Sequence, residues 1–182
     1  MQPFKIVIAG EGGQGVQSIA KVIAQAAFNQ GKKAVYVPYF STEKRGGTTE
    51  AYTQVGDTVP AYPKFAKADL WAVLSERAIE RIYPYLKDDT KVIVNSFLVT
   101  DVSKIKNWDP LEINAGEIAT KQLKKPRAFN MVIMGAMVKM IPGLDKAKFL
   151  EALKAQFKVK YEKDPELEAV NAKAFEIGYE LA

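Results

Sequence analysis

The chain contains 182 residues, carries a formal net charge of +5 and has neither cysteine nor histidine. Those two absences exclude disulfides, cysteine-ligated iron–sulfur clusters, the usual structural zinc sites, thiol nucleophiles and a Ser-His-Asp triad. With 48% hydrophobic and 26% charged residues, the composition is that of a globular protein, and the length predicts one domain over residues 1–182.

The first predicted element is a strand over residues 4–9, an apolar run rich in β-branched side chains. A glycine-rich turn at residues 10–15 follows it, and residues 16–27 show the apolar spacing of a helix. Glycines let the backbone turn sharply and bring its amide groups close to a ligand. The N-terminus of the following helix offers unpaired N–H donors and partial positive charge, so the turn is a candidate anion site.

The glycine spacing matches the dinucleotide pattern G-x-G-x-x-G at Gly10, Gly12 and Gly15, but two nucleotide motifs are incomplete here. No acidic residue occurs between positions 11 and 43, so the acid that holds a ribose about 20 residues after the turn is missing. Val16 and Gln17 take the places of the Lys and the Ser/Thr of a phosphate loop. A turn that only packs the helix on the strand explains these residues equally well.

Strands and helices alternate along the next hundred residues. Strands are predicted over residues 34–39, 50–55, 69–74, 91–95 and 111–113, and helices over residues 75–86 and 115–123. Pro38 indicates that the first of these strands ends there or lies exposed, and the alternating pattern of residues 50–55 makes that strand the candidate for an antiparallel one. The order predicts a three-layer α/β/α fold with a mostly parallel, Rossmann-like sheet.

The last third of the chain is predicted to be a helical C-terminal tail. Residues 129–141 are apolar nearly throughout, which predicts a buried helix. Asp145 and Asp164 are candidate caps of two further helices, and Pro165 fits the first turn of the second.

Two glycine-rich loops are predicted to meet at the carboxyl edge of the sheet, where open α/β folds bind ligands. They are residues 10–15 and residues 41–48, and the strand ends at residues 75–76 and 95–96 face the same edge. Arg45 in the second loop offers a planar fork of donors that suits phosphate or carboxylate. The alternative for Arg45 is an ordinary surface or interface ion pair.

Three motifs occur together: GEGGQGV at residues 10–16, RGGT at residues 45–48 and NAKAFEIGY at residues 171–179. With them the chain resembles, over essentially its whole length, the gamma subunit of the 2-oxoacid:ferredoxin oxidoreductases. That family acts on pyruvate, 2-oxoglutarate, branched-chain 2-oxoacids and indolepyruvate. The resemblance implies a complex that oxidatively decarboxylates a 2-oxoacid to an acyl-CoA and reduces ferredoxin.

The resemblance also implies which groups this chain holds. Thiamine diphosphate and iron–sulfur clusters are expected in partner subunits, and ferredoxin is reached through the complex. The chain alone is expected to bind no cofactor, to hold no metal, to carry no catalytic residue and to be inactive by itself. Coenzyme A is expected at a shared site, for which the candidate residues are Gly12, Gly13, Gln14, Gly15, Arg45, Gly46, Gly47 and Thr48.

Two other functions stay open at this stage: an independent nucleotide-binding oxidoreductase, which the missing ribose-holding acid disfavours, and a non-catalytic scaffold module. The lysines are spread along the chain rather than gathered in a basic groove, so no nucleic-acid partner is expected. The longest apolar run, residues 131–138, is far below the roughly 20 residues of a bilayer span, and no signal peptide is recognisable. The sequence therefore predicts a cytoplasmic protein that does not enter a membrane.

Overall fold

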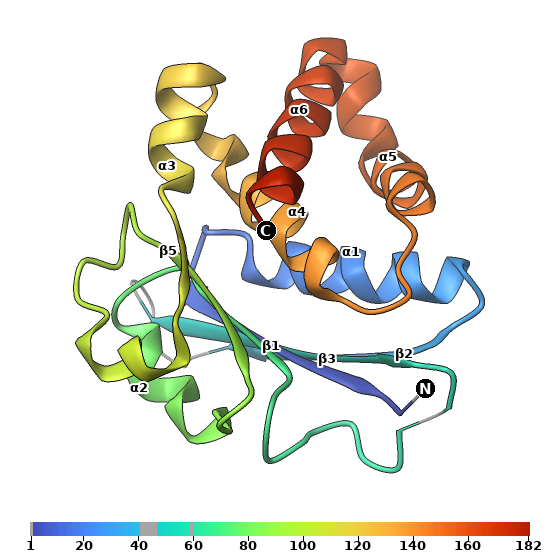
Figure 1. Cartoon of the computed structure of the whole chain (residues 1–182). Helices are drawn as coiled ribbons and strands as arrows, with labels where there is room; N and C mark the ends of the chain where they lie inside the picture. Colours follow the sequence, from blue (N-terminus) through green and yellow to red (C-terminus); the bar gives the residue numbers. More distant parts are fainter. Residues whose placement is uncertain (1, 41–46, 59) are drawn as a thin grey trace.

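The computed structural model describes residues 2–40, 47–58 and 60–182 (Figure 1). Their strands form one sheet with the order β2-β3-β1-β4-β5-β6. Strand β3 is antiparallel to both of its neighbours, β1 and β2, whereas β1, β4, β5 and β6 run parallel to one another. The mostly parallel sheet and its antiparallel strand are therefore confirmed. The strands are β1 (Phe4–Glu11), β2 (Lys33–Phe40), β3 (Thr48–Gly56), β4 (Leu70–Val73), β5 (Lys91–Asn95) and β6 (Leu111–Ile113).

Helices cover both faces of the sheet (Figure 1). One face carries α1 (Val16–Asn29) and α4 (Phe129–Met140), with α5 (Lys146–Lys163) and α6 (Pro165–Leu181) packed over them. The other face carries α2 (Ala78–Ile82), the 3-10 turn η1 (Tyr83–Tyr85) and the 3-10 segment η2 (Ser103–Trp108). Between β6 and α4 the chain forms α3 (Ala115–Glu117), the π-helical turn η3 (Ile118–Gln122) and the 3-10 turn η4 (Pro126–Ala128).

The alternation of side chains along β1 divides the buried residues into two cores. Ile6 and Ile8 point toward α1 and α4, and Val7 and Ala9 point toward α2. Successive strand residues face opposite sides of a sheet, so a strand covered on both faces is apolar at every position. This explains why residues 6–9 are all apolar.

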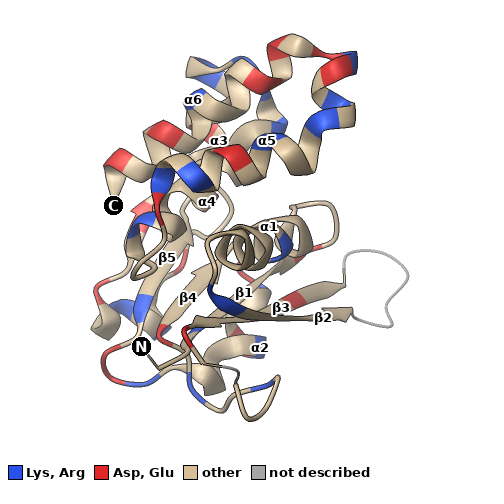
Figure 2. Ribbon diagram, turned by 90° about the vertical axis from the view of Figure 1, so that its right-hand side faces the viewer, with Lys and Arg blue, Asp and Glu red and all other residues tan. Residues whose placement is uncertain are grey.

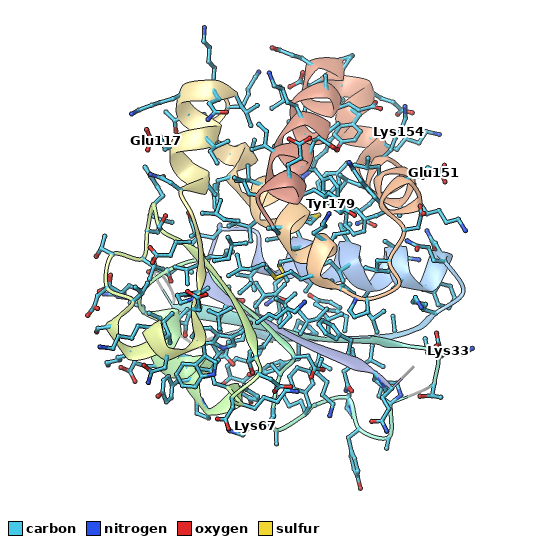
Figure 3. The ribbon with its side chains drawn as sticks, in the orientation of Figure 1. Lys33, Lys67, Glu117, Glu151, Lys154 and Tyr179 are labelled. Atoms are coloured by element: carbon cyan, nitrogen blue, oxygen red, sulfur yellow. The ribbon has the colours of Figure 1, made fainter. Side chains whose placement is uncertain are left out.

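The two C-terminal helices form a second helical layer over α1 and α4. Asp145 and Asp164 cap α5 and α6 as expected, because each side chain accepts a hydrogen bond from a backbone N–H in the first turn of its helix. The ring of Tyr179 on α6 lies 4.7 Å from Nζ of Lys139 on α4 and 4.6 Å from Nζ of Lys146 on α5, which joins the three helices (Figure 3).

One predicted helix is much shorter than its sequence pattern suggests. The segment 75–86 forms only the five-residue α2, followed by the 3-10 turn η1. Pro84 lies in that turn, and a proline removes the N–H that the next helical turn would need. Residues 115–123 likewise form a single α-helical turn and a π-helical turn rather than one regular helix. Among the described residues, no helix combines the length and the hydropathy that crossing a bilayer requires.

Candidate functional site

The glycine turn joins the end of β1 at Glu11 to the start of α1 at Val16. Gly13 and Gly15 have φ angles of +92° and +86°, the left-handed region that glycine adopts without strain. The side-chain oxygen of Gln14 accepts a hydrogen bond from the Glu11 backbone N–H at 2.8 Å, and the Gln14 N–H donates to the Glu11 carbonyl at 3.2 Å. Gln14, a predicted ligand residue, therefore holds the turn in shape with its own side chain.

The glycines of this turn have different surroundings. A Cβ at Gly10 would lie 2.5 Å from Oε1 of Gln14, and a Cβ at Gly15 would lie 2.6 Å from Nδ2 of Asn130. Both positions are therefore filled by the protein's own side chains. Gly12 and Gly13 face open space, with nothing within 4 Å of an added Cβ.

A hollow of about 310 Å³ lies beside the turn. Helix α1 begins there without a side-chain cap at Gly15 and without an acid in its first turn, so its first N–H donors are left for an outside acceptor. Glu11 is the acidic residue of the lining, and the exposed ring of Phe40 also lines the hollow. The lining consists of Glu11, Gly12, Gly13, Gly15, Val16, Gln17, Ser18, Phe40 and Thr49.

The second glycine-rich loop adjoins the first where the structure describes it. Thr48 lies directly opposite Glu11 in the β1–β3 ladder, and Thr49 lies opposite Gly10. Gly47 precedes Thr48 and is partly exposed. Arg45 and Gly46 lie outside the described residues, so their part in the site stays a prediction.

Two other strand ends that face this edge do not line the hollow. Ser75 and Asn95 are only 3% and 0% exposed, and within the described part of the chain their side-chain polar atoms have no hydrogen-bond partner. Glu76 points elsewhere, because its carboxylate accepts hydrogen bonds from the N–H and the hydroxyl of Thr100 at 3.2 and 3.0 Å. The hollow is therefore built by β1, β2, β3 and α1.

Gln17 is a residue of the site that sequence analysis noted only as a departure from the phosphate-loop pattern. Its amide nitrogen donates to the hydroxyl of Thr49 at 2.7 Å and to the carbonyl of Glu50 at 2.9 Å. Its side-chain oxygen accepts a hydrogen bond from the Tyr36 hydroxyl at 2.8 Å. Burial raises the pKa of Tyr36, which favours the protonated phenol that donates this hydrogen bond. Gln17 thus ties α1 to β2 and β3 behind the hollow.

Asn130 was also missed by sequence analysis. It stands in the first turn of α4, and its side chain lies over Gly15 at the start of α1. The N-termini of two helices therefore converge at the glycine turn. The signal in the sequence was a single amide residue in the first turn of a helix that is apolar except for Lys139 near its end.

A cluster of charged and aromatic side chains lies on the opposite face of the sheet from α1. Glu50 of β3 is 4% exposed, and its carboxylate accepts hydrogen bonds from Nε of Arg81 at 2.9 Å and from the hydroxyl of Tyr52. The Arg81 guanidinium lies 5.6 Å from the ring of Tyr39, and Nζ of Lys64 lies 5.3 Å from the same ring. The cluster holds together the last residues of β2 and the first residues of β3.

The electrostatics of this cluster follow from its burial. Burial is the main cause that raises the pKa of Tyr52 far above its ordinary value, and the hydrogen bond to Glu50 adds to it. The hydrogen bond to Glu50 raises the pKa of Arg81. Glu50 is therefore a carboxylate held between one cation and one phenol, which is a structural arrangement that anchors α2 to the sheet.

Comparison with known proteins matches residues 5–181 to the family described as pyruvate ferredoxin/flavodoxin oxidoreductase. The chain is 31% identical to the 2-oxoglutarate synthase subunit KorC of Archaeoglobus fulgidus, with 97% of this chain and 86% of the relative aligned. It is 32% identical to the pyruvate/ketoisovalerate oxidoreductases common subunit gamma of Pyrococcus abyssi, with 97% of this chain and 96% of the relative aligned.

Solved structures agree with these sequence relatives. The gamma subunit of a keto/oxoacid ferredoxin oxidoreductase from Geobacter sulfurreducens superposes with a TM-score of 0.81 at 26% identity, and 98% of each chain is covered. A 2-oxoglutarate:ferredoxin oxidoreductase from Magnetococcus marinus, solved with 2-oxoglutarate, coenzyme A and succinyl-CoA bound, superposes with a TM-score of 0.86 at 23% identity. This chain covers only 31% of that larger one, so the likeness concerns the fold. From its matched length, its relatives and its fold, the chain belongs to the pyruvate ferredoxin/flavodoxin oxidoreductase family, in its gamma-subunit form.

Proposed function

We propose that this chain is the gamma subunit of a complex that oxidatively decarboxylates a 2-oxoacid to an acyl-CoA and reduces ferredoxin, and that the glycine-turn hollow is part of the coenzyme A site. The named relatives, which are subunits of 2-oxoglutarate and pyruvate/ketoisovalerate enzymes, support the first half. The geometry of the turn supports the second half.

The observation that carries the second half is Gly12. Position 15 requires glycine because its φ angle is positive and because Asn130 leaves no room for a Cβ. Gly12 is not among the glycines with positive φ, and a Cβ there would stand in open space. Nothing within the described fold therefore requires glycine at position 12. A ligand or a partner backbone that approaches the turn closely would require it.

The backbone around the hollow suits the diphosphate of coenzyme A, and Glu11 is the acidic residue of the same lining. The uncapped start of α1 offers N–H donors and partial positive charge, and the turn is open on the side of Gly12 and Gly13. Arg45, with its fork of donors, and Gly46, Gly47 and Thr48 complete the proposed site from the adjoining loop. Coenzyme A supplies the thiol that receives the acyl group, and this chain binds and orients it.

The redox chemistry falls to other subunits in this proposal. The chain has no cysteine to hold an iron–sulfur cluster through thiolates, and it has no histidine. Thiamine diphosphate and the clusters are therefore assigned to partner subunits, and this chain alone is proposed to be inactive.

The test compares alanine substitutions at two glycines of the same turn and adds one larger substitution at Gly12. In the complex assembled with its partner subunits, Gly12→Ala should weaken coenzyme A binding about tenfold by calorimetry while leaving the melting temperature of the gamma chain unchanged. Gly12→Leu should weaken binding further, because its side chain extends farther into the hollow. Gly15→Ala is the matched control and should lower the melting temperature, because it meets Asn130 in a left-handed conformation. Unchanged coenzyme A affinity and unchanged assembly in both Gly12 variants would refute the assignment of the glycine turn.

A further inference from the structure

A second hollow of about 260 Å³ adjoins the glycine-turn hollow on the exposed side of α1. The two hollows share Gln17 and Ser18 in their linings and so adjoin each other along α1; together they are called the groove. Helix α1 lies between the sheet and α5, and the second hollow opens between α1, β2 and α5 (Figure 2). Its lining includes Lys21, Tyr36, Phe157 and Lys160.

The charge of this second hollow is unlike that of its neighbours. It is lined by two lysines, Lys21 and Lys160, and by no acidic residue. The hollow between α5 and α6 instead contains Lys154 paired with Glu168 at 2.7 Å. Across the described part of the chain, neither Lys21 nor Lys160 takes part in an ion pair, and both are exposed. Lys160 lies over the ring of Phe157 at 5.2 Å, and no acidic side chain of the described residues neutralises either lysine.

The spacing along α1 sets the distance between the two parts of the groove. Six residues separate Gly15 at the start of α1 from Lys21, and Ser18 lies between them. At 1.5 Å per residue, the six residues from Gly15 to Lys21 span about 9 Å. A nucleotide ligand that carries one anionic group on each side of its ribose ring has its two groups about this far apart.

We propose that Lys21 and Lys160 bind the 3′-phosphate of coenzyme A while its diphosphate lies at the glycine turn. The inference rests on the proposed function of that turn. In coenzyme A the diphosphate is attached at the 5′ position of the ribose and the third phosphate at the 3′ position, so the ligand presents two anionic groups to one groove. Two lysines act as mobile point charges on the single phosphate, and the Ser18 hydroxyl between the hollows donates to the ligand.

The function of this subsite is to discriminate coenzyme A from ligands that lack the 3′-phosphate. A ligand that lacks the 3′-phosphate, such as 3′-dephospho-coenzyme A, leaves both lysines hydrated and gains nothing from them. Loss of charge-assisted hydrogen bonds to one group changes affinity by about ten- to a hundredfold. The wild-type complex should therefore prefer coenzyme A over its dephospho form by about that factor.

The experiment measures binding of both ligands by calorimetry to the complex assembled with its partner subunits. Lys21→Ala and Lys160→Ala should each weaken coenzyme A binding about tenfold, and the double variant should remove the preference for the 3′-phosphate. The affinity for 3′-dephospho-coenzyme A should stay the same in all of them. Lys158→Ala is the matched control, because Lys158 stands on α5 beside Lys160 but does not line the hollow; it should change neither affinity.

The outcomes separate this inference from the proposed function. If wild-type complex binds neither ligand, the proposed coenzyme A site fails and this inference fails with it. If the wild type binds both ligands equally, or the double variant keeps the preference, the subsite is overturned while the glycine turn stands. If the lysine variants instead weaken subunit assembly in native mass spectrometry with no change in ligand preference, the groove holds an acidic segment of a partner subunit and the subsite is likewise overturned.

Discussion

Gly178 of α6 lies directly against the backbone carbonyl of Val132 in α4: a Cβ at position 178 would fall 1.8 Å from that oxygen. The contact is reciprocal, because a Cβ at Gly135 of α4 would fall 2.0 Å from the carbonyl oxygen of Phe175. The two helices therefore cross with their backbones in contact, which is closer than ordinary side-chain packing permits. This contact fixes α6 on α4, and α4 carries Asn130 to the glycine turn.

Gly178→Ala should destabilise the chain by about 3 kcal/mol, because backbone atoms cannot yield to a new methyl group as a flexible side chain can. The direction of this change in the free energy of unfolding is informative, because a Gly to Ala substitution within a helix ordinarily stabilises a protein by about 0.5–1 kcal/mol. Urea unfolding of the isolated chain measures the change. Ala169→Gly, at an exposed position of the same helix, is the control and should cost only about 1 kcal/mol. An unchanged or raised stability in Gly178→Ala would show that α4 and α6 are not in backbone contact.

Arg81→Ala should destabilise the fold by about 2 kcal/mol, because it leaves the buried carboxylate of Glu50 without its cation. The figure is below that for a fully buried pair, since the Arg81 side chain is 47% exposed. Adding Glu50→Gln to Arg81→Ala should recover part of the loss, because the uncompensated buried charge is then gone. A double-mutant cycle by chemical denaturation measures the coupling, and fully additive effects would contradict the proposed pairing.

Stability should fall as the pH rises above about 10, the ordinary pKa of tyrosine, because the pKa of Tyr52 is higher in the folded chain than in the unfolded chain. Within that range the unfolded chain loses a proton that the folded chain keeps, so each further pH unit costs up to about 1.4 kcal/mol. Below about pH 10 this tyrosine contributes no pH dependence.

Tyr52→Phe isolates this effect from the lysines and from Tyr36 and Tyr161, whose raised pKa values act in the same direction. The free energy of unfolding of the variant should decline less steeply between pH 10 and 11.5 than that of the wild type. The comparison concerns the slopes, because the variant also loses its hydrogen bond to Glu50. Parallel slopes would contradict a protonated Tyr52 in the folded chain.

Arg45→Ala should weaken coenzyme A binding or subunit assembly while leaving the melting temperature of the isolated chain unchanged. A charge-assisted contact at a desolvated site is worth about 2–5 kcal/mol, whereas an exposed ion pair is worth about 0–1 kcal/mol. The measurements are calorimetry with coenzyme A and native mass spectrometry of the complex. Lys33→Ala removes a positive charge at the far end of β2 and serves as the control. If both properties are unchanged in Arg45→Ala, Arg45 is a surface ion pair.

The sequence by itself determined the local elements and their order. The apolar run that includes residues 6–9 predicted a buried strand, and the alternating residues 50–55 predicted the antiparallel β3. Such patterns are reliable because the side-chain period of a strand or helix is imposed by its own backbone. The helix predicted over residues 75–86 was too long. Its apolar spacing indicated a helix, but Pro84 ends the helical hydrogen bonding before that spacing does.

Tertiary structure decided what each glycine of the turn is for. Gly10, Gly12 and Gly15 share one motif, yet a Cβ would collide with Gln14 at the first and with Asn130 at the last, and would meet open space at Gly12. Asn130 comes from a helix more than a hundred residues farther along the chain. Spacing within a motif carries no information on such a contact, because α1 and α4 come together only when both helices pack on the same face of the sheet. The same packing brought Lys160 of α5 and Lys21 of α1 into the lining of one hollow.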